Sequence, residues 1–192
     1  MFKKLVIGIL GLSGYATTTM AATPPVASEA AIEASILASA NFMNMDRLLP
    51  VDTDATDSDA EILRLVADLL NEANLHIGTR YVRGGKSPKG FDCSGFTSYV
   101  YRQFGYRLSP SSRGQYTDGI EISTDEVKPG DLLFFKGRRS RSVGHVAIAI
   151  DADPETGDIT FIHAAVKGGI RVDRVSMPYY SQRFLGARRV IN

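Results

Sequence analysis

The sequence GFDCSGFTSYVYRQF at residues 90–104 decides the fold, because it predicts a helix that begins at Cys93 or at the next residue. Apolar residues spaced four apart, Phe96, Val100 and Phe104, form one face of this helix. A thiol in the first helical turn meets free backbone N–H groups and the positive end of the helix dipole, and both lower its pKa. The pattern leaves two interpretations open, a reactive thiol and an ordinary buried cysteine.

A second amphipathic helix is predicted upstream. Ser58 followed by Glu61 fits a capping box, and apolar residues then recur on one face from Ile62 to Ala73. A loop rich in Gly and basic residues, residues 78–90, joins the two predicted helices.

Short apolar runs separated by turns predict strands after Pro129-Gly130. The predicted strands are residues 132–135, 145–150, 159–163, 170–172 and 183–190. Helices come first and a meander of strands follows, without alternating strand–helix units. This order predicts an α+β fold with an antiparallel sheet.

The composition allows one domain with an appendage: 192 residues, a net charge of +1 and a single cysteine. One cysteine excludes an intramolecular disulfide framework and any multi-cysteine zinc or iron–sulfur site within one chain. Lys3 and Lys4, an apolar run at residues 5–12 and small residues up to Ala21 predict a cleaved signal peptide at residues 1–21. We therefore expect a periplasmic or secreted protein.

The signal sequence also bears on membrane attachment. Its apolar run is far shorter than the roughly 20 residues needed to span a bilayer, and no cysteine near residue 20 offers a lipid attachment site. We expect the protein not to be membrane-anchored after signal cleavage. An unpaired thiol outside the cytoplasm is unusual, so it is inert, bonded to another chain or retained for chemistry.

Charge divides the mature chain into an acidic part and a basic part. Residues 22–79 carry a net charge of −8 and residues 80–141 a net charge of +6. Residues 22–57 are rich in Ala, Ser, Thr, Pro and Asp and predict an acidic, low-complexity linker, which leaves residues 58–192 as the folded domain. A near-zero net charge, export and the lack of aromatic residues among the arginines argue against nucleic-acid binding.

Two of the three histidines lie where they could act with the cysteine. His145 opens one predicted strand, His163 ends the next, and adjacent strands of a meander can place both on one face. A nucleophilic thiol needs a base and a third group that orients this base. The alternative is two strand-end histidines with local hydrogen bonds. His76 is expected to be a surface or helix-capping residue, and with no short ligand spacing among the histidines we expect no metal and no cofactor.

Several motifs together resemble those of NlpC-type, papain-like cell-wall cysteine peptidases. They are DCSGF at residues 92–96, GHVAI at 144–148, FIHA at 161–164, GTRYVRGG at 78–85, Arg113-x-Gln115 and KPGDLLFF at 128–135. The resemblance covers residues from about 60 to 190 in the order of the family. It implies a papain-like α+β fold with helices packed on an antiparallel sheet and a nucleophile at a helix N-terminus.

The resemblance also implies an activity: hydrolysis of peptidoglycan stem peptides, typically between D-γ-glutamyl and a diamino acid. It implies that Cys93 attacks the carbonyl, that His145 is the general base and that His163 orients it. The resemblance further suggests that four residues bind the substrate: Tyr81, Asp92, Ser111 and Arg113.

Alternatives remain at this point: an amidase of a related papain-like family, a catalytically dead wall-binding domain, and a dimer linked through Cys93. The sequence departs from the family at Arg83, where the family often has Trp, and in a basic insert at residues 136–142. The basic residues either attract the carboxylates of stem peptides or form a solvated charged loop.

Overall fold

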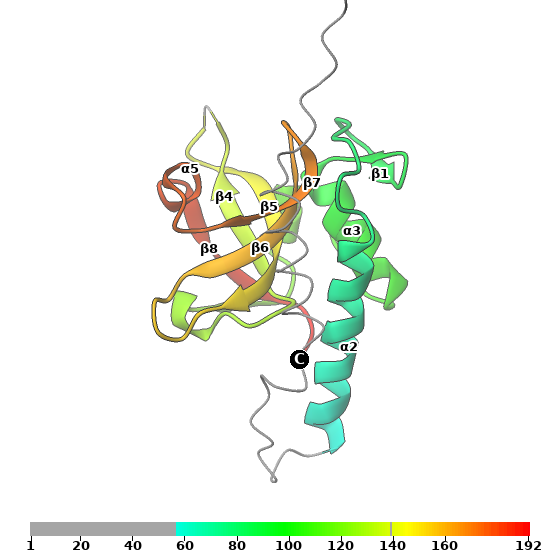
Figure 1. Cartoon of the computed structure of the whole chain (residues 1–192), viewed down its shortest axis with the longest axis vertical. Coiled ribbons are helices and arrows are strands. Elements are labelled where there is room, and N and C mark those ends of the chain that lie inside the picture. The colour runs from blue at the N-terminus through cyan, green and yellow to red at the C-terminus, as the bar shows by residue number, and fades with distance from the viewer. Residues whose placement is uncertain (1–56, 139) are drawn as a thin grey trace, which may run out of the picture. The chain divides into compact units, whose positions relative to one another are not determined.

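The two longest helices of the described residues lie together on one side of an antiparallel sheet in the computed structural model of the protein (Figure 1). The structure describes residues 57–138 and 140–192. The predicted signal peptide, residues 1–21, and the predicted linker up to residue 56 lie outside the described residues. Within the described ranges, no helix is long and apolar enough to cross a membrane.

Helix α2 spans Asp57–Asn74 and confirms the predicted upstream helix. It begins one residue before the predicted cap, so Ser58 lies inside the first turn rather than ahead of it. The apolar face of α2 buries Leu69, Leu70 and Ala73 almost completely. One apolar face therefore holds α2 in position, as the spacing predicts.

Helix α3 spans Cys93–Gln103 and starts at the predicted residue. Asp92 is its N-cap, and one carboxylate oxygen of Asp92 accepts a hydrogen bond of 2.7 Å from the backbone N–H of Gly95. Phe96 and Val100 are fully buried. The cap and the apolar face together fix where this helix begins and how it is rotated.

The basic loop before α3 contains a small hairpin, β1 (Lys86–Ser87) paired with β2 (Gly90–Phe91). The second carboxylate oxygen of Asp92 accepts a hydrogen bond of 2.9 Å from the backbone N–H of Gly84. Asp92 thus ties this loop to the start of α3, which holds the two together at the cysteine.

A short helix, α4 (Ser112–Gln115), is locked to α3 by a buried side chain. The amide nitrogen of Gln115 donates to the carbonyls of Ser94 and Ser109, and its oxygen accepts from the hydroxyl of Thr97 at 2.8 Å. Gln115 is fully buried, so these bonds compensate for the loss of hydration.

The sheet has six strands within the described residues. They are β3 (Ile120–Ile122), β4 (Leu132–Lys136), β5 (Val143–Ala152), β6 (Ile159–Ala165), β7 (Gly169–Arg174) and β8 (Phe184–Arg189). Their order is β3-β8-β4-β5-β6-β7, and every neighbouring pair is antiparallel. The predicted α+β class with an antiparallel sheet is confirmed.

The predicted simple meander holds for β4 to β7 and is wrong for the last strand. β8 returns to pair with β4, because the edge of β4 opposite β5 would otherwise lie open. β3, which pairs with β8, was not predicted. It has three residues, and Ile120 and Glu121 are exposed, so no apolar periodicity marks it.

Both faces of the sheet are buried, which explains the continuous apolar runs. On one face, Leu133, Phe135, Ala147 and Phe161 form a cluster with Tyr180, which belongs to α5 (Pro178–Ser181). Against the sheet, α3 contacts β5 and β6, and it contacts α2 on another side. The interface between α3 and β5 is where the helical and the sheet layers meet.

Gly95→Ala tests the close approach of α3 to the loop before it. A Cβ atom at Gly95 would clash with the carbonyl oxygen of Gly85. We expect the substitution to lower the free energy of unfolding by about 1–3 kcal/mol, measured by urea denaturation. Gly137→Ala is the control, because its Cβ would meet nothing closer than 3.4 Å. Equal stability of the two variants would contradict this packing.

Candidate active site

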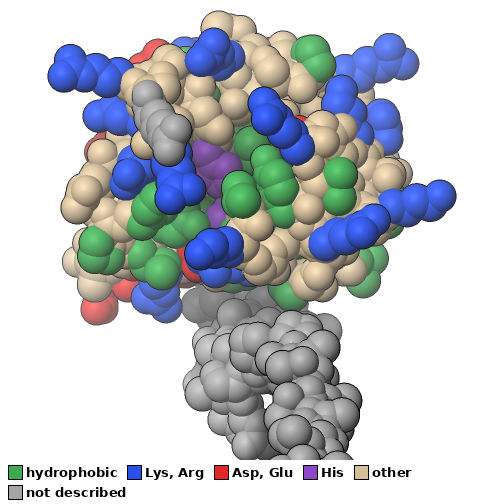
Figure 2. All heavy atoms as spheres, turned by 90° about the horizontal axis from the view of Figure 1, so that it is seen from above, with side chains coloured by type: hydrophobic (Ala, Val, Ile, Leu, Met, Phe, Trp, Pro, Cys, Tyr) green, Lys and Arg blue, Asp and Glu red, His purple; other side chains and the backbone are tan. Residues whose placement is uncertain are grey.

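Cys93, His145 and His163 line one cavity with a volume of about 540 Å³. Figure 2 shows histidine side chains at the bottom of a hollow, bordered by hydrophobic side chains and surrounded by Lys and Arg. The three residues come from three elements, α3, β5 and β6. The fold therefore brings together side chains that lie up to 70 residues apart in the sequence.

The thiol of Cys93 is half-buried at the first residue of α3. Burial raises its pKa, and backbone N–H groups of Val146, Ser94 and Cys93 itself act in the opposite direction without outweighing burial. The predicted lowering of the pKa is therefore wrong for the resting site, although the predicted N–H groups are present. A neutral thiol needs a base to remove its proton.

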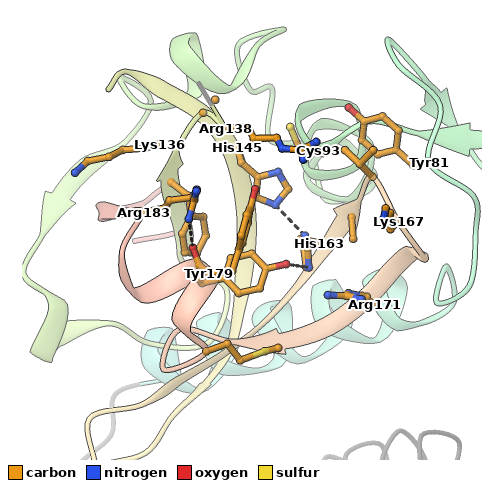
Figure 3. A pocket seen from close by; sticks show the side chains of 17 residues that line it. Tyr81, Cys93, Lys136, Arg138, His145, His163, Lys167, Arg171, Tyr179 and Arg183 are labelled. Carbon is orange, nitrogen blue, oxygen red and sulfur yellow. Dashed lines mark hydrogen bonds between the residues drawn. The ribbon is translucent and has the colours of Figure 1, made fainter. Parts of the chain in front are cut away.

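His145 and His163 are in direct contact. Nε2 of His145 lies 2.8 Å from Nδ1 of His163, and the two rings are nearly perpendicular, with an angle of 89°. Figure 3 shows this hydrogen bond as a dashed line, with Cys93 close to the ring of His145. The predicted placement of both histidines on one face of the sheet is what the structure has.

Asp173 on β7 lies behind His163 and was not predicted. One oxygen of its carboxylate, Oδ2, is 2.9 Å from Nε2 of His163 and accepts hydrogen bonds from Arg171 and from the hydroxyl of Tyr180. Burial alone would raise the pKa of Asp173, but these donors outweigh it and lower the pKa below its ordinary value. Asp173 is therefore an ionised carboxylate and a pure acceptor.

The ionised Asp173 determines where the protons sit on both histidines. Nε2–H of His163 must donate to the carboxylate, so Nδ1 of His163 accepts from Nε2–H of His145. Nδ1 of His145 is then the nitrogen with a free lone pair. The hydrogen-bond chain thus leaves a basic nitrogen on the histidine nearest the thiol.

Both histidines are neutral at pH 7. Burial, helped by repulsion from His163, lowers the pKa of His145 to about 3, and Asp173 only partly counteracts this effect. Burial also lowers the pKa of His163, against the opposing effect of Asp173. A neutral imidazole is the form that can accept a proton from a thiol.

The four predicted substrate-binding residues do not lie together. Tyr81 lines the cavity, whereas Asp92, Ser111 and Arg113 do not. Asp92 caps α3, Ser111 caps α4, and Arg113 donates to the carbonyl of Val143 and the hydroxyl of Ser142. These three side chains hold the walls in place rather than face the cavity.

The basic insert contributes only in part to the cavity. Lys136 and Arg138 line it, while Arg141 does not, and Arg139 lies outside the described residues. Arg83, at which the sequence departs from the family, does not line the cavity either. Arg138 is exposed to solvent as well as lining the cavity, so both interpretations of the insert stand for this residue.

His76 corrects a prediction. It is buried rather than on the surface, and its ring lies edge-on to Phe91, Phe96 and Tyr99. Its Nε2 lies 3.1 Å from a carboxylate oxygen of Glu72. An aromatic ring with one local polar partner fits a buried position, and His76 has no contact with the cavity.

In the residues that the structure describes, no group of three or more His, Cys, Asp and Glu side chains could hold a metal ion. The cavity brings together a thiol and a neutral imidazole, with backbone N–H groups near the sulfur. This set suits nucleophilic attack on a carbonyl.

Comparison with known proteins identifies the family. A model of the NlpC/P60 family matches residues 78–189, more than half of the chain. The chain belongs to the NlpC/P60 family. The resemblance inferred from the motifs is confirmed, and the chain is accordingly a hydrolase of the cysteine peptidase type.

Relatives extend the comparison over most of the domain. A probable endopeptidase from Haemophilus influenzae is 34% identical over 68% of this chain and 78% of the relative. A murein DD-endopeptidase and LD-carboxypeptidase from Escherichia coli is 38% identical over 60% of this chain and 57% of the relative. A γ-D-glutamyl-L-lysine dipeptidyl-peptidase from Bacillus cereus is 32% identical over 65% of this chain and 36% of the relative.

Solved structures agree on the fold. An NlpC/P60 family protein from Bacillus cereus matches with a TM-score of 0.59 and 31% identity, over 66% of this chain and 40% of that chain. Helices packed against an antiparallel sheet are thus the fold of the NlpC/P60 proteins that this chain resembles.

The lowered pKa of His145 predicts how stability changes with pH. Below pH 6.5 the unfolded chain binds a proton that the folded His145 does not take up until about pH 3. The free energy of unfolding should therefore fall as the pH drops from 6.5, by up to about 1.4 kcal/mol per pH unit for one such group.

Urea denaturation of wild type and His145→Gln at pH 5 to 8 measures this effect. The variant should lose less stability between pH 6.5 and 5, and the two proteins should run parallel above pH 7. The same slope in both proteins below pH 6.5 would show that His145 is not held neutral by the fold.

Proposed function

We propose that this chain is a cysteine endopeptidase that hydrolyses peptidoglycan stem peptides, at the bond between D-γ-glutamyl and a diamino acid. The observation that carries the proposal is the hydrogen-bond chain from His145 through His163 to Asp173, which ends beside the thiol of Cys93. The names of the relatives, with endopeptidases of murein and of γ-D-glutamyl peptides among them, support the substrate class.

Catalysis begins with proton transfer from the thiol to Nδ1 of His145. The thiolate attacks the carbonyl carbon of the scissile bond, and the oxygen of that carbonyl becomes an oxyanion. The backbone N–H groups of Cys93 and Ser94, which counteract the rise in the pKa of the thiol in the resting site, can stabilise this oxyanion. The position of Cys93 at the start of α3 therefore serves both steps.

His145 then donates its proton to the leaving amine, and a thioester forms between Cys93 and the glutamyl carbonyl. The same nitrogen of His145 next takes a proton from water, and the hydroxide attacks the thioester. The C–S bond breaks, the carboxylic acid product is released, and His145 returns its proton to the sulfur of Cys93. His145 thus alternates between base and acid.

His163 and Asp173 orient and stabilise the charged state of His145. When His145 carries two protons, its Nε2–H still donates to His163, and the charge of Asp173 acts through His163. Asp173 raises the pKa of both histidines against the effect of burial. We propose both as positioning residues, with His163 in contact with the base.

Cys93→Ala should abolish cleavage of purified peptidoglycan and leave the fold intact, because no other thiol exists in the chain. The measurement is mass spectrometry of the released fragments, with circular dichroism of the variant. His76→Gln is the matched control, since this buried residue lies outside the cavity, and it should retain activity.

A thiol reagent provides a second check. Iodoacetamide can modify only Cys93, so inactivation should follow one modification per chain. Activity in Cys93→Ala equal to that of wild type would overturn the mechanism. Fragments cut only at other bonds of peptidoglycan would overturn the bond assignment alone.

We also propose that the protein acts outside the cytoplasm, in the periplasm or as a secreted enzyme. Support comes from the sequence of residues 1–21, with two lysines followed by a short apolar run and small residues. The substrate class agrees with this location, because peptidoglycan lies outside the membrane.

Expression of the full chain in a bacterium with an outer membrane tests export. The periplasmic protein should begin at Ala22, as read by N-terminal sequencing, because cleavage is predicted after Ala21. Deletion of residues 5–12 should keep the protein in the cytoplasm with its N-terminus uncleaved. An intact residue 1–21 segment on periplasmic wild type would contradict signal cleavage.

A further inference from the structure

The hydroxyl of Tyr180 lies between the two groups that orient the base. Its oxygen is 2.7 Å from Oδ2 of Asp173 and 3.2 Å from Nε2 of His163, and Figure 3 draws the bond to His163 as a dashed line. All three side chains are buried. Hydrogen bonds to a charged group are strong in such surroundings, because little water competes for the partners.

The ring of Tyr180 is held in place independently of its hydroxyl. It packs against Phe135 and Phe161, with ring centres 5.5 Å and 5.0 Å away. The backbone N–H of Tyr180 donates to the carbonyl of Met177 at 2.8 Å, at the start of α5. Removal of the oxygen alone would therefore leave the ring in position, and any effect of that change reports on the hydroxyl.

The hydroxyl is a donor to Asp173. Burial raises the pKa of Tyr180, and its hydrogen bond to Asp173 raises it further, so the hydroxyl keeps its hydrogen throughout the neutral range. One hydrogen serves one acceptor, and the carboxylate is nearer than His163 and carries the charge. The oxygen of Tyr180 then turns a lone pair toward Nε2–H of His163.

A chain of two neutral imidazoles can hold its protons in two arrangements. In the first, the Nε2 atoms of His145 and His163 carry them, and Nδ1 of His145 is free. In the second, the Nδ1 atoms carry them, and Nε2 of His163 has only a lone pair. Only the first arrangement lets His145 take the proton of Cys93. The direction of the chain therefore decides whether the site can react.

Tyr180 favours the first arrangement. There its hydroxyl donates to Asp173 and accepts from His163, so that each hydrogen has an acceptor. In the second arrangement, the lone pair of Nε2 would face the ionised carboxylate at 2.9 Å with no hydrogen between them. The single hydrogen of Tyr180 would then have to satisfy both acceptors, which it cannot do.

Arg171, the other donor to Asp173 besides His163, is less shielded than Tyr180. Its guanidinium donates to the same oxygen at 2.6 Å and 2.9 Å, yet its side chain is 43% exposed and lines the cavity. Water, salt and bound ligands can compete for it. Tyr180 is only 5% exposed, so its donation to Asp173 does not depend on what the cavity contains.

We propose that Tyr180 is a positioning residue for the proposed reaction: its hydroxyl sets the direction of the hydrogen-bond chain, so that Nδ1 of His145 stays free to accept the thiol proton. This inference rests on the proposed function. Tyr180 acts through Asp173 and His163 rather than on the thiol itself.

Tyr180→Phe tests the proposal, because it removes one oxygen and keeps the ring. With L-alanyl-γ-D-glutamyl-diaminopimelate as the substrate, we expect kcat to fall about tenfold, which corresponds to the loss of one hydrogen bond to a charged group. KM should stay within about twofold of wild type, because the hydroxyl does not hold the substrate.

The same variant should change the pH profile. Oδ2 of Asp173 is faced by His163 from β6, by Arg171 from its own strand β7 and by Tyr180 from α5. Without the hydroxyl, the lowered pKa of Asp173 rises toward its ordinary value. The carboxylate then takes up a proton at a higher pH, so kcat of Tyr180→Phe should begin to drop at a higher pH than kcat of wild type as the solution is acidified.

Nitrogen-15 NMR of the ring nitrogens measures the proton arrangement directly and needs no substrate. The chain has three histidines, and the signals of the third are assigned with His76→Gln. In wild type at pH 7 we expect a bare Nδ1 and a protonated Nε2 on both His145 and His163. In Tyr180→Phe, a measurable fraction of His145 should carry its proton on Nδ1.

Tyr179→Phe is the matched control. Tyr179 lies on the same helix and lines the same cavity, but its ring contacts Tyr180 and Arg183. This variant should keep the pH profile and the nitrogen-15 pattern of wild type. A wild-type profile and pattern in Tyr180→Phe would overturn the inference, even if its kcat fell. Wild type that does not cleave the peptide would overturn the proposed function, and the NMR comparison would still decide whether Tyr180 sets the direction of the chain.

Discussion

A buried carboxylate, that of Asp173, is the interaction on which the rest of the site depends. One of its two oxygens, Oδ2, lies within hydrogen-bond distance of His163, Arg171 and Tyr180. An unpaired carboxylate at this depth would be costly, so the three donors hold β6, β7 and α5 together around it. The same carboxylate fixes the proton on each histidine. Fold and chemistry are thus joined at one side chain that never reaches the cavity.

The basic lining and the neutral catalytic groups fit together physically. Cys93, His145 and His163 are uncharged in the resting protein because burial opposes their charged forms. Lys136, Arg138 and Lys167 also line the cavity, and water still reaches them. An anionic peptide would therefore be attracted by the rim and react at a neutral centre, and charge would appear there only during the reaction.

Much of this architecture could be predicted from local patterns. The capped helix at Cys93, the antiparallel strands and the pairing of His145 with His163 follow from periodicity and motifs. The return of β8 to β4 could not be predicted, because pairing between distant strands leaves no local signal. Asp173 was missed for a similar reason: its role depends on the register that sets His163 opposite Arg171 and on Tyr180 from a separate helix. The only trace in the sequence is an acidic residue in a short strand.

The direction of the pKa shift of Cys93 could not be predicted either. It depends on burial, which the position of the residue at a helix start does not reveal.

The reacting groups belong to two different layers. The thiol is carried by α3, whose first turn is tied to the preceding loop through Asp92, while the base and its partners are carried by the sheet. No covalent link or shared element keeps sulfur and imidazole at their working distance; packing between α3 and β5 does so. The distance between the sulfur of Cys93 and the imidazole of His145 therefore depends directly on how α3 packs against β5. A small separation of the layers would switch the enzyme off while each layer kept its own hydrogen bonds.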